Sequence, residues 1–179
     1  MQRGNNLKIK KNKIGILGGS FDPAHKGHLA ISKIAKKKLK IRKIFWAITK
    51  KNPFKKKSNF DLSTRIKLCK KITKKIKYIE VKCFENMLRS NKTINLINFF
   101  AKNEMNEIFF IMGADNLINF HKWHKWKAIS KKCILVVFDR QGYKKKSLNS
   151  KTYKTLNKEK LKFINFNKVN ISSSQLRKI

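Results

Sequence analysis

The chain is poor in acidic residues, cysteine and proline, and it has no long apolar run. Its 179 residues include 46 Lys and Arg against 9 Asp and Glu, a formal net charge of +37, with 3 Cys and 2 Pro. No apolar stretch approaches the roughly 20 residues that span a bilayer, and the basic N-terminus lacks the apolar segment of a signal peptide. These absences argue against a membrane-spanning or disulfide-built protein and predict a cytoplasmic one.

The three cysteines are too far apart and too few to suggest a disulfide framework or a metal site. Cys69, Cys83 and Cys133 form no C-x-x-C pair, so we expect buried, reduced thiols. His121 and His124 are three residues apart, but no third ligand follows nearby, and a structural metal is therefore disfavoured.

The cationic excess has two interpretations. It is nearly all Lys, it is spread along the whole chain, and Asn, Ile and Phe are abundant beside it. These are residues that A+T-rich codons encode, which favours mutational bias over specific nucleic-acid binding, although a basic nucleic-acid-binding protein stays the alternative. In either case the positive field attracts small phosphorylated molecules.

Short apolar segments alternate with amphipathic ones along the chain, which predicts β-α-β units in one α/β domain over residues 1–179. A basic N-terminal extension covers 1–12, and a Lys-rich loop or irregular helix is expected over 144–160. The ligand crevice of such a doubly wound parallel sheet lies beyond the carboxyl ends of the strands. Strands are expected at 13–17, 43–48, 78–83, 107–112, 133–138 and 161–166, and helices at 27–39, 61–76, 93–101, 116–129 and from Ser172.

The densest motif is GGSFDPAHKGH at residues 18–28, between the first strand and the first helix. Gly18 and Gly19 let the backbone turn sharply and approach a ligand closely, and a helix N-terminus directs N–H groups at an anion. His25 and His28 supply hydrogen-bond donors for an oxygen that gains charge in a transition state. The two histidines alone would be read as capping or packing residues, but together with the glycine pair they favour a phosphate site.

This motif resembles the signature of the HxGH nucleotidyltransferases, adenylyl- and cytidylyltransferases with Rossmann-like sheets. The segment ISSSQLR at 171–177 is similar to the family's I-S-S-T-x-[IVL]-R, with Ser174 in place of Thr. Its serine hydroxyls and Arg fork suit phosphate. The resemblance implies that both ends of the chain hold one triphosphate.

The middle of the chain resembles nicotinate-nucleotide adenylyltransferases. The segments that carry the likeness are GADN at 113–116 followed by Trp123, DRQGY at 139–143, NPFK at 52–55, and Thr93, where Lys92 replaces the family's Tyr. The resemblance implies transfer of the adenylyl group of ATP to nicotinate mononucleotide in NAD biosynthesis, with Mg²⁺ bound through the phosphates and no metal-binding residue in the protein. The relatives usually continue further beyond the final Arg.

Residue roles follow from the same resemblance. The catalytic residues are His25, His28 and Arg177. The ATP-binding residues are Gly18, Gly19, Ser20, Phe21, His25, His28, Gly113, Asp115, Arg140, Ser173, Ser174 and Arg177. The acceptor-binding residues are Asn52, Lys55, Thr93 and Trp123. The expected partners are ATP and nicotinate mononucleotide, with no specific nucleic acid and no membrane, and a homo-oligomer stays open. The remaining alternatives are adenylyl transfer to nicotinamide mononucleotide or phosphopantetheine, a cytidylyl transfer, and a nucleotide sensor without catalysis.

Overall fold

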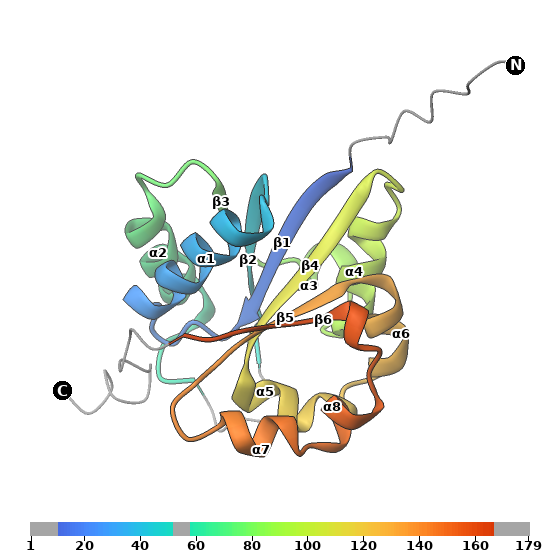
Figure 1. Ribbon diagram of the computed structural model, residues 1–179. Coiled ribbons are helices and arrows are strands. Elements are labelled where there is room, and N and C mark those ends of the chain that lie inside the picture. The colour runs from blue at the N-terminus through green and yellow to red at the C-terminus, as the bar shows by residue number, and fades with distance from the viewer. Residues whose placement is uncertain (1–10, 52–57, 167–179) are drawn as a thin grey trace, which may run out of the picture.

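The protein is built on a six-stranded parallel sheet. A computed structural model describes residues 11–51 and 58–166, and its strands lie in the order β3-β2-β1-β4-β5-β6 (Figure 1). The strands are β1 (Asn12–Gly19), β2 (Lys43–Ile48), β3 (Ile79–Lys82), β4 (Asn106–Gly113), β5 (Ile134–Phe138) and β6 (Leu161–Ile164). This order confirms the Rossmann-like, doubly wound α/β fold expected from the sequence.

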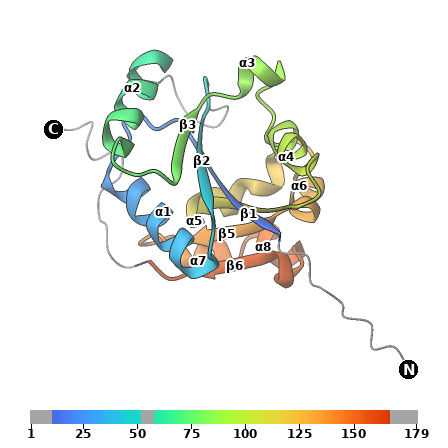
Figure 2. The ribbon, with the colours of Figure 1, turned by 90° about the horizontal axis from the view of Figure 1, so that it is seen from above.

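Helices cover both faces of the sheet. Figure 2 shows α1 and α2 on one face and α4 and α6 on the other. The α-helices are α1 (Lys26–Leu39), α2 (Leu62–Thr73), α3 (Glu85–Leu88), α4 (Thr93–Ala101), α5 (Ala114–Asn119), α6 (Trp126–Lys132), α7 (Lys144–Leu148) and α8 (Lys151–Thr155), with 3-10 turns η1 (Phe120–Lys122) and η2 (Lys158–Lys160). Among the described residues, no helix has the length and apolar composition to span a bilayer.

Two apolar cores result from the alternation of side chains along the central strands. In β4, Phe110 and Met112 belong to the core beneath α4, α5 and α6, whereas Phe109 and Ile111 belong to the core beneath α1 and α2. Because both faces are covered, β4 is apolar at five consecutive positions, Ile108 to Met112. This continuous apolar run marks a central strand.

The strand order reverses between β1 and β4. β1 pairs with β2 on one side and with β4 on the other, all in parallel. Connections from the carboxyl ends of these two strands leave in opposite directions, which opens a crevice at that point. In Figure 1 these ends lie in the lower part of the molecule, near α5.

The first strand is longer than the sequence predicted. Gly18 and Gly19 still pair with Ala47 and Ile48 of β2, so the chain turns only from Ser20 onward. The prediction that the glycine pair makes the turn was wrong, because parallel pairing with β2 continues through both residues. The left-handed residue of the turn is Phe21, with φ of 48°.

Two other segments also differ from the expectation. The helical region expected at 116–129 is divided, because Lys125 adopts a left-handed conformation with φ of 53° and begins a new helix, α6. The Lys-rich stretch 144–160 contains α7, α8 and η2, and the Ser150 side chain caps α8 by accepting from the Tyr153 N–H. The expected terminal helix at Ser172 and residues 1–10 of the basic extension lie outside the described residues.

Candidate functional site

The connection from β1 to α1 is held in a strained conformation by buried aromatic packing. A left-handed backbone is uncommon for a bulky residue, yet Phe21 adopts it with only 2% of its surface exposed. Its ring stacks on Trp46, with centroids 5.0 Å apart and planes at 20°, and meets the His28 ring at 4.7 Å. The turn is therefore fixed by the core below it.

His25 and His28 form a reciprocal cap at the start of α1. Nδ1 of His25 accepts from the Gly27 N–H at 3.1 Å, and Nδ1 of His28 accepts from the His25 N–H at 3.2 Å. The ring centroids are 3.9 Å apart. A neutral imidazole that accepts at Nδ1 carries its proton on Nε2. Capping therefore selects the tautomer in which Nε2 is the donor in both rings.

The environment keeps His25 uncharged. Burial, and secondarily the positive charge of Arg140, lower the pKa of His25 from 6.5 to about 4. A neutral His25 at pH 7 agrees with the cap, because a protonated ring would have no lone pair with which to accept at Nδ1.

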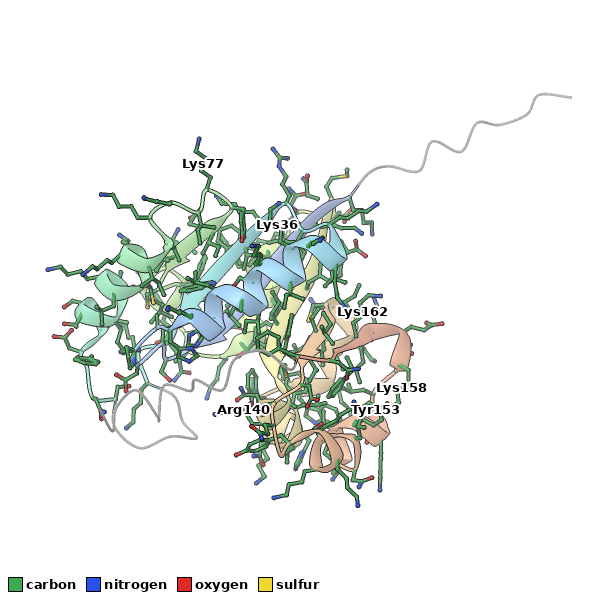
Figure 3. The ribbon with its side chains drawn as sticks, turned by 60° about the vertical axis from the view of Figure 1, so that its left-hand side comes forward. Lys36, Lys77, Arg140, Tyr153, Lys158 and Lys162 are labelled. Atoms are coloured by element: carbon green, nitrogen blue, oxygen red, sulfur yellow. The ribbon has the colours of Figure 1, made fainter. Side chains whose placement is uncertain are left out.

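Residues that follow β4 and β5 meet at the same edge of the sheet. Arg140 donates through Nη1 to Asp115 Oδ2 at 2.8 Å, and its guanidinium lies 5.5 Å from the Tyr143 ring centroid. A Cβ at Gly113 would contact Asp115 Oδ1 too closely, so a larger residue at this position would displace the carboxylate from its observed place. Arg140 lies two residues after the end of β5, in the lower half of the molecule in Figure 3. The structure thus brings Asp115 and Arg140 together, with Arg140 near enough to act on His25.

A polar groove opens beside the end of β2. Thr49 follows β2 and donates its N–H to Gly19 O at 3.0 Å. Its hydroxyl also donates to Glu85 Oε1, which accepts from the Lys50 N–H at 3.1 Å. The groove has a volume of about 610 Å³ and is lined by Lys50, Glu85, Asn86, Arg89, Ser90, Asn91 and Lys92. Three cations and one carboxylate line it, and Thr93 begins α4 directly after Lys92.

Comparison with known proteins shows the family to which the sequence belongs. Residues 16–179 match the model of the family described as Cytidylyltransferase-like. A Pelagibacter ubique protein named as a nicotinate-nucleotide adenylyltransferase is 67% identical, over 98% of this chain and 97% of that protein. The chain belongs to the nicotinate-nucleotide adenylyltransferase family. An Agrobacterium fabrum protein named in the same way is 38% identical over 72% of this chain and 70% of that protein.

Solved structures of the same family share the fold. The nicotinic acid mononucleotide adenylyltransferase of Plasmodium falciparum, complexed with APC, superposes with a TM-score of 0.74 at 21% identity, covering 93% of this chain and 83% of that one. A structure of the same Plasmodium protein complexed with NaAD gives a TM-score of 0.73 at 22% identity and the same coverage.

Of the remaining candidate residues, Trp123 and Phe21 are described by the structure, and five others are not. Trp123 is half-buried and packs on Phe120 and Phe110, with ring centroids 5.2 Å and 6.0 Å apart. Phe21 is buried, so a contact with a nucleotide would involve its backbone. Asn52, Lys55, Ser173, Ser174 and Arg177 lie outside the described residues, and their roles stay predictions.

Sequence reasoning missed three polar residues that build the site. The Asp22 carboxylate accepts from the N–H groups of Asn59 and Phe60 at 2.9 Å and 3.0 Å. Glu85 joins the end of β2 to α3, and Arg65 reaches the β1–α1 turn from α2. A signal existed for Arg65, because it lies three residues after Leu62, on the face of the helix that was expected to be apolar.

His121 and two of the three cysteines contact or are buried against the protein's own residues. The ring Nδ1 of His121 lies 3.1 Å from Ile118 O, and the backbone N–H of His121 donates to Thr152 Oγ1. Cys69 and Cys133 are buried free thiols whose pKa values burial raises to about 12, while Cys83 is only half-buried. The side chains that the structure describes contain no group of three that could hold a metal ion.

Proposed function

We propose that the chain transfers the adenylyl group of ATP to nicotinate mononucleotide, forming nicotinate adenine dinucleotide and pyrophosphate. The observation that carries this proposal is the pair of histidines at the switch point of the sheet that cap α1 through Nδ1 and leave Nε2 as the donor. Close relationship to a protein named for this enzyme supports the choice of substrates. The Plasmodium neighbour solved with NaAD supports the same dinucleotide product.

The chemistry needs alignment and charge neutralisation more than proton transfer. A phosphate oxygen of the mononucleotide attacks the α-phosphorus of ATP, and the bond to the bridging oxygen breaks as pyrophosphate leaves. The nucleophile is already an anion, so no general base is required. His25 and His28 would donate from Nε2 to oxygens around the α-phosphorus, and one such donor contributes about 10²–10³ in rate.

The ATP site would extend from β1 to β4. Gly18 and Gly19 allow close approach of the triphosphate to the backbone, and Ser20 offers its N–H and hydroxyl. Gly113 and Asp115 would hold the ribose and adenine, and Arg140 lies beside them. Ser173, Ser174 and Arg177 are proposed to bind the β- and γ-phosphates, on the strength of the family motif.

The acceptor would lie in the groove beside the end of β2. Nicotinate mononucleotide carries a phosphate and a carboxylate, and Lys50, Arg89 and Lys92 give the groove a matching positive charge. Thr93 at the start of α4 and the half-buried Trp123 are proposed to meet the pyridine ring. Asn52 and Lys55 complete the proposed set.

We infer that Mg²⁺ enters with ATP as part of the substrate. Asp115 is paired with Arg140, and Asp22 accepts from two backbone N–H groups. The arrangement suits an ion held by phosphate oxygens and water, as Mg²⁺ prefers. The cytoplasmic location and the formation of a homo-oligomer stay predictions.

A panel of acceptors tests the function. We expect pyrophosphate release from ATP and Mg²⁺ with nicotinate mononucleotide, and much less with nicotinamide mononucleotide or phosphopantetheine, with products identified by mass spectrometry. Preference for another acceptor would replace the substrate assignment. Release with none of them, together with salt-dependent binding to DNA, would support the nucleic-acid alternative instead.

The histidine assignment is tested in the same assay. We expect His28→Ala to lower kcat by about 10²–10³, because it removes one donor to the reacting phosphate. His124→Ala, which changes an exposed histidine outside the turn, should leave kcat near that of the unmutated protein. Circular dichroism of both variants should show intact folds, and an unchanged kcat in His28→Ala would remove His28 from the mechanism.

A further inference from the structure

Arg65 of α2 is buried beneath the β1–α1 turn. Only 2% of its surface is exposed, and it is the one buried Lys or Arg among the residues that the structure describes. Its guanidinium donates to four backbone carbonyl oxygens: Nη1 to Ser20 at 2.7 Å and to Thr49 at 2.8 Å, Nη2 to Lys50 at 3.0 Å, and Nε to Phe60 at 3.1 Å. None of the ion pairs within the described residues involves Arg65.

The four carbonyls belong to three segments that the proposed reaction must keep in register. Ser20 begins the β1–α1 turn, Thr49 and Lys50 follow β2, and Phe60 precedes α2. A planar guanidinium presents its donors in a fixed fork, so the directions of its bonds fix the carbonyls relative to one another. A lysine ammonium is a single point with rotatable donors and could not hold the same four positions.

Asp22 completes the connection from the opposite side. Its carboxylate accepts from the N–H groups of Asn59 and Phe60, while Arg65 takes the carbonyl of Phe60. Both the turn and α2 therefore hold the same short segment. Since Thr49 also donates to Gly19 O, the end of β2 is tied to the end of β1 beside this point.

All of these hydrogen bonds go to carbonyl oxygens, and the charge of the exposed Asp61 carboxylate acts on Arg65 without an ion pair. A buried cation without a close carboxylate partner is expensive to maintain. The hydrogen bonds of Arg65 stabilise the protein, but an apolar side chain of similar volume would fill the same space without the cost of removing a charge from water. Its position beneath Ser20, next to the expected triphosphate, gives the charge a use, because the anionic nucleotide would offset it.

We propose that Arg65 is a positioning residue for adenylyl transfer. It holds the Ser20 backbone and the end of β2 in one fixed arrangement, so that the β1–α1 turn and the groove beside the end of β2 keep the relative position that the transfer requires. Arg65 does not touch the substrate and acts through the backbone of the turn. This proposal rests on the proposed function.

The test compares Arg65→Lys and Arg65→Ala with two controls. Arg42→Lys makes the same change at an exposed position, and Leu156→Ala removes a buried side chain from the opposite core. We expect Arg65→Lys to stay folded and to lose about 10- to 100-fold in kcat, with a smaller change in the KM for ATP, because misalignment acts mainly on the reacting geometry. All rates are measured well below each variant's melting temperature.

Chemical rescue separates positioning from stability. Millimolar methylguanidine should restore part of the kcat of Arg65→Ala, at least tenfold, whereas ethylammonium of the same charge should not. If Arg65→Ala fails to fold, Arg65→Gln is tested for the same rescue beside Arg65→Lys.

Two results would overturn the proposal in different ways. If Arg65→Lys keeps its kcat and only melts earlier, as Leu156→Ala is expected to do, Arg65 is structural and the positioning role is wrong. If the unmutated protein releases no pyrophosphate with any acceptor, the proposed function fails, and this role fails with it.

Discussion

At the scale of single residues, His25 and His28 cap α1 through Nδ1 and keep Nε2 for the proposed phosphate contact. The sequence left a choice between histidines that cap a helix and histidines that bind phosphate. In the structure, the caps use Nδ1 of His25 and His28, which places the proton of each neutral ring on Nε2. The two interpretations are therefore compatible, because each uses a different nitrogen of the ring.

The low pKa of His25 gives a direct prediction. In the folded protein this pKa is about 4, against 6.5 for an ordinary histidine, mainly because of burial. We expect His25 to stay neutral at pH 5.5 and to show Nε2-protonated ¹⁵N shifts. Arg140→Gln should raise its pKa without restoring 6.5, since burial remains.

The consequence for stability has a definite sign. A histidine whose pKa is lowered by folding takes up a proton more readily in the unfolded state. The stability contributed by neutral His25 is thus complete above about pH 6.5 and is lost as the pH falls toward 4. The difference in free energy of unfolding between the unmutated protein and His25→Gln should shrink over this window. A ¹⁵N titration of His25 centred at 6.5 would contradict both expectations.

At the scale of elements, the junction of β4 and α5 depends on a glycine. A methyl group at position 113 would collide with the Asp115 carboxylate, which pairs with Arg140. The sequence identified all three residues from family motifs. It could not show that the glycine lies against the side chain two residues later, because that contact depends on how the strand enters the helix.

A double-mutant cycle tests this junction. We expect Gly113→Ala to raise the KM for ATP about tenfold by displacing Asp115, and Asp115→Ala to have a similar effect. If Gly113→Ala acts through Asp115, the double variant should have a KM for ATP no higher than that of either single variant. This would be strong non-additivity, as is found for residues in contact. Additive effects would show that Gly113 is needed for another reason, such as close approach of the nucleotide.

Element boundaries were predictable where the chain is apolar and uninterrupted. Strand Lys43–Ile48 and helix Thr93–Ala101 have the expected bounds, and Asp61 caps α2 as expected by accepting from the Thr64 N–H. α3 was not predicted, because a helix of four residues has no periodicity to recognise. The division at Lys125 was missed because a left-handed lysine has no sequence signal.

At the scale of the whole molecule, the charge of +37 is a property of the entire surface. The excess cations repel one another in the compact state, and the same field attracts anionic substrates. Both effects weaken with salt, but they change different measurements.

Salt therefore has two expected effects. From about 20 to 300 mM NaCl, which shortens the screening length severalfold, kcat/KM for ATP should fall severalfold while kcat changes little. Over the same range the melting temperature should rise, because self-repulsion is screened. A sucrose series matched in viscosity is the control. A kcat/KM that does not depend on salt would show that the field does not steer the substrate.

The sequence by itself predicted the alternation of strands and helices, the histidine motif between β1 and α1 and the cationic charge, because each depends on residues that are neighbours in the chain. The tertiary structure alone decided which distant residues cooperate. Arg65 reaches carbonyls at positions 20, 49, 50 and 60, and Arg140 lies beside Asp115. Such contacts follow from strand order and packing, which bring the carboxyl ends of separate strands to one edge. The spacing of residues along the chain does not predict them.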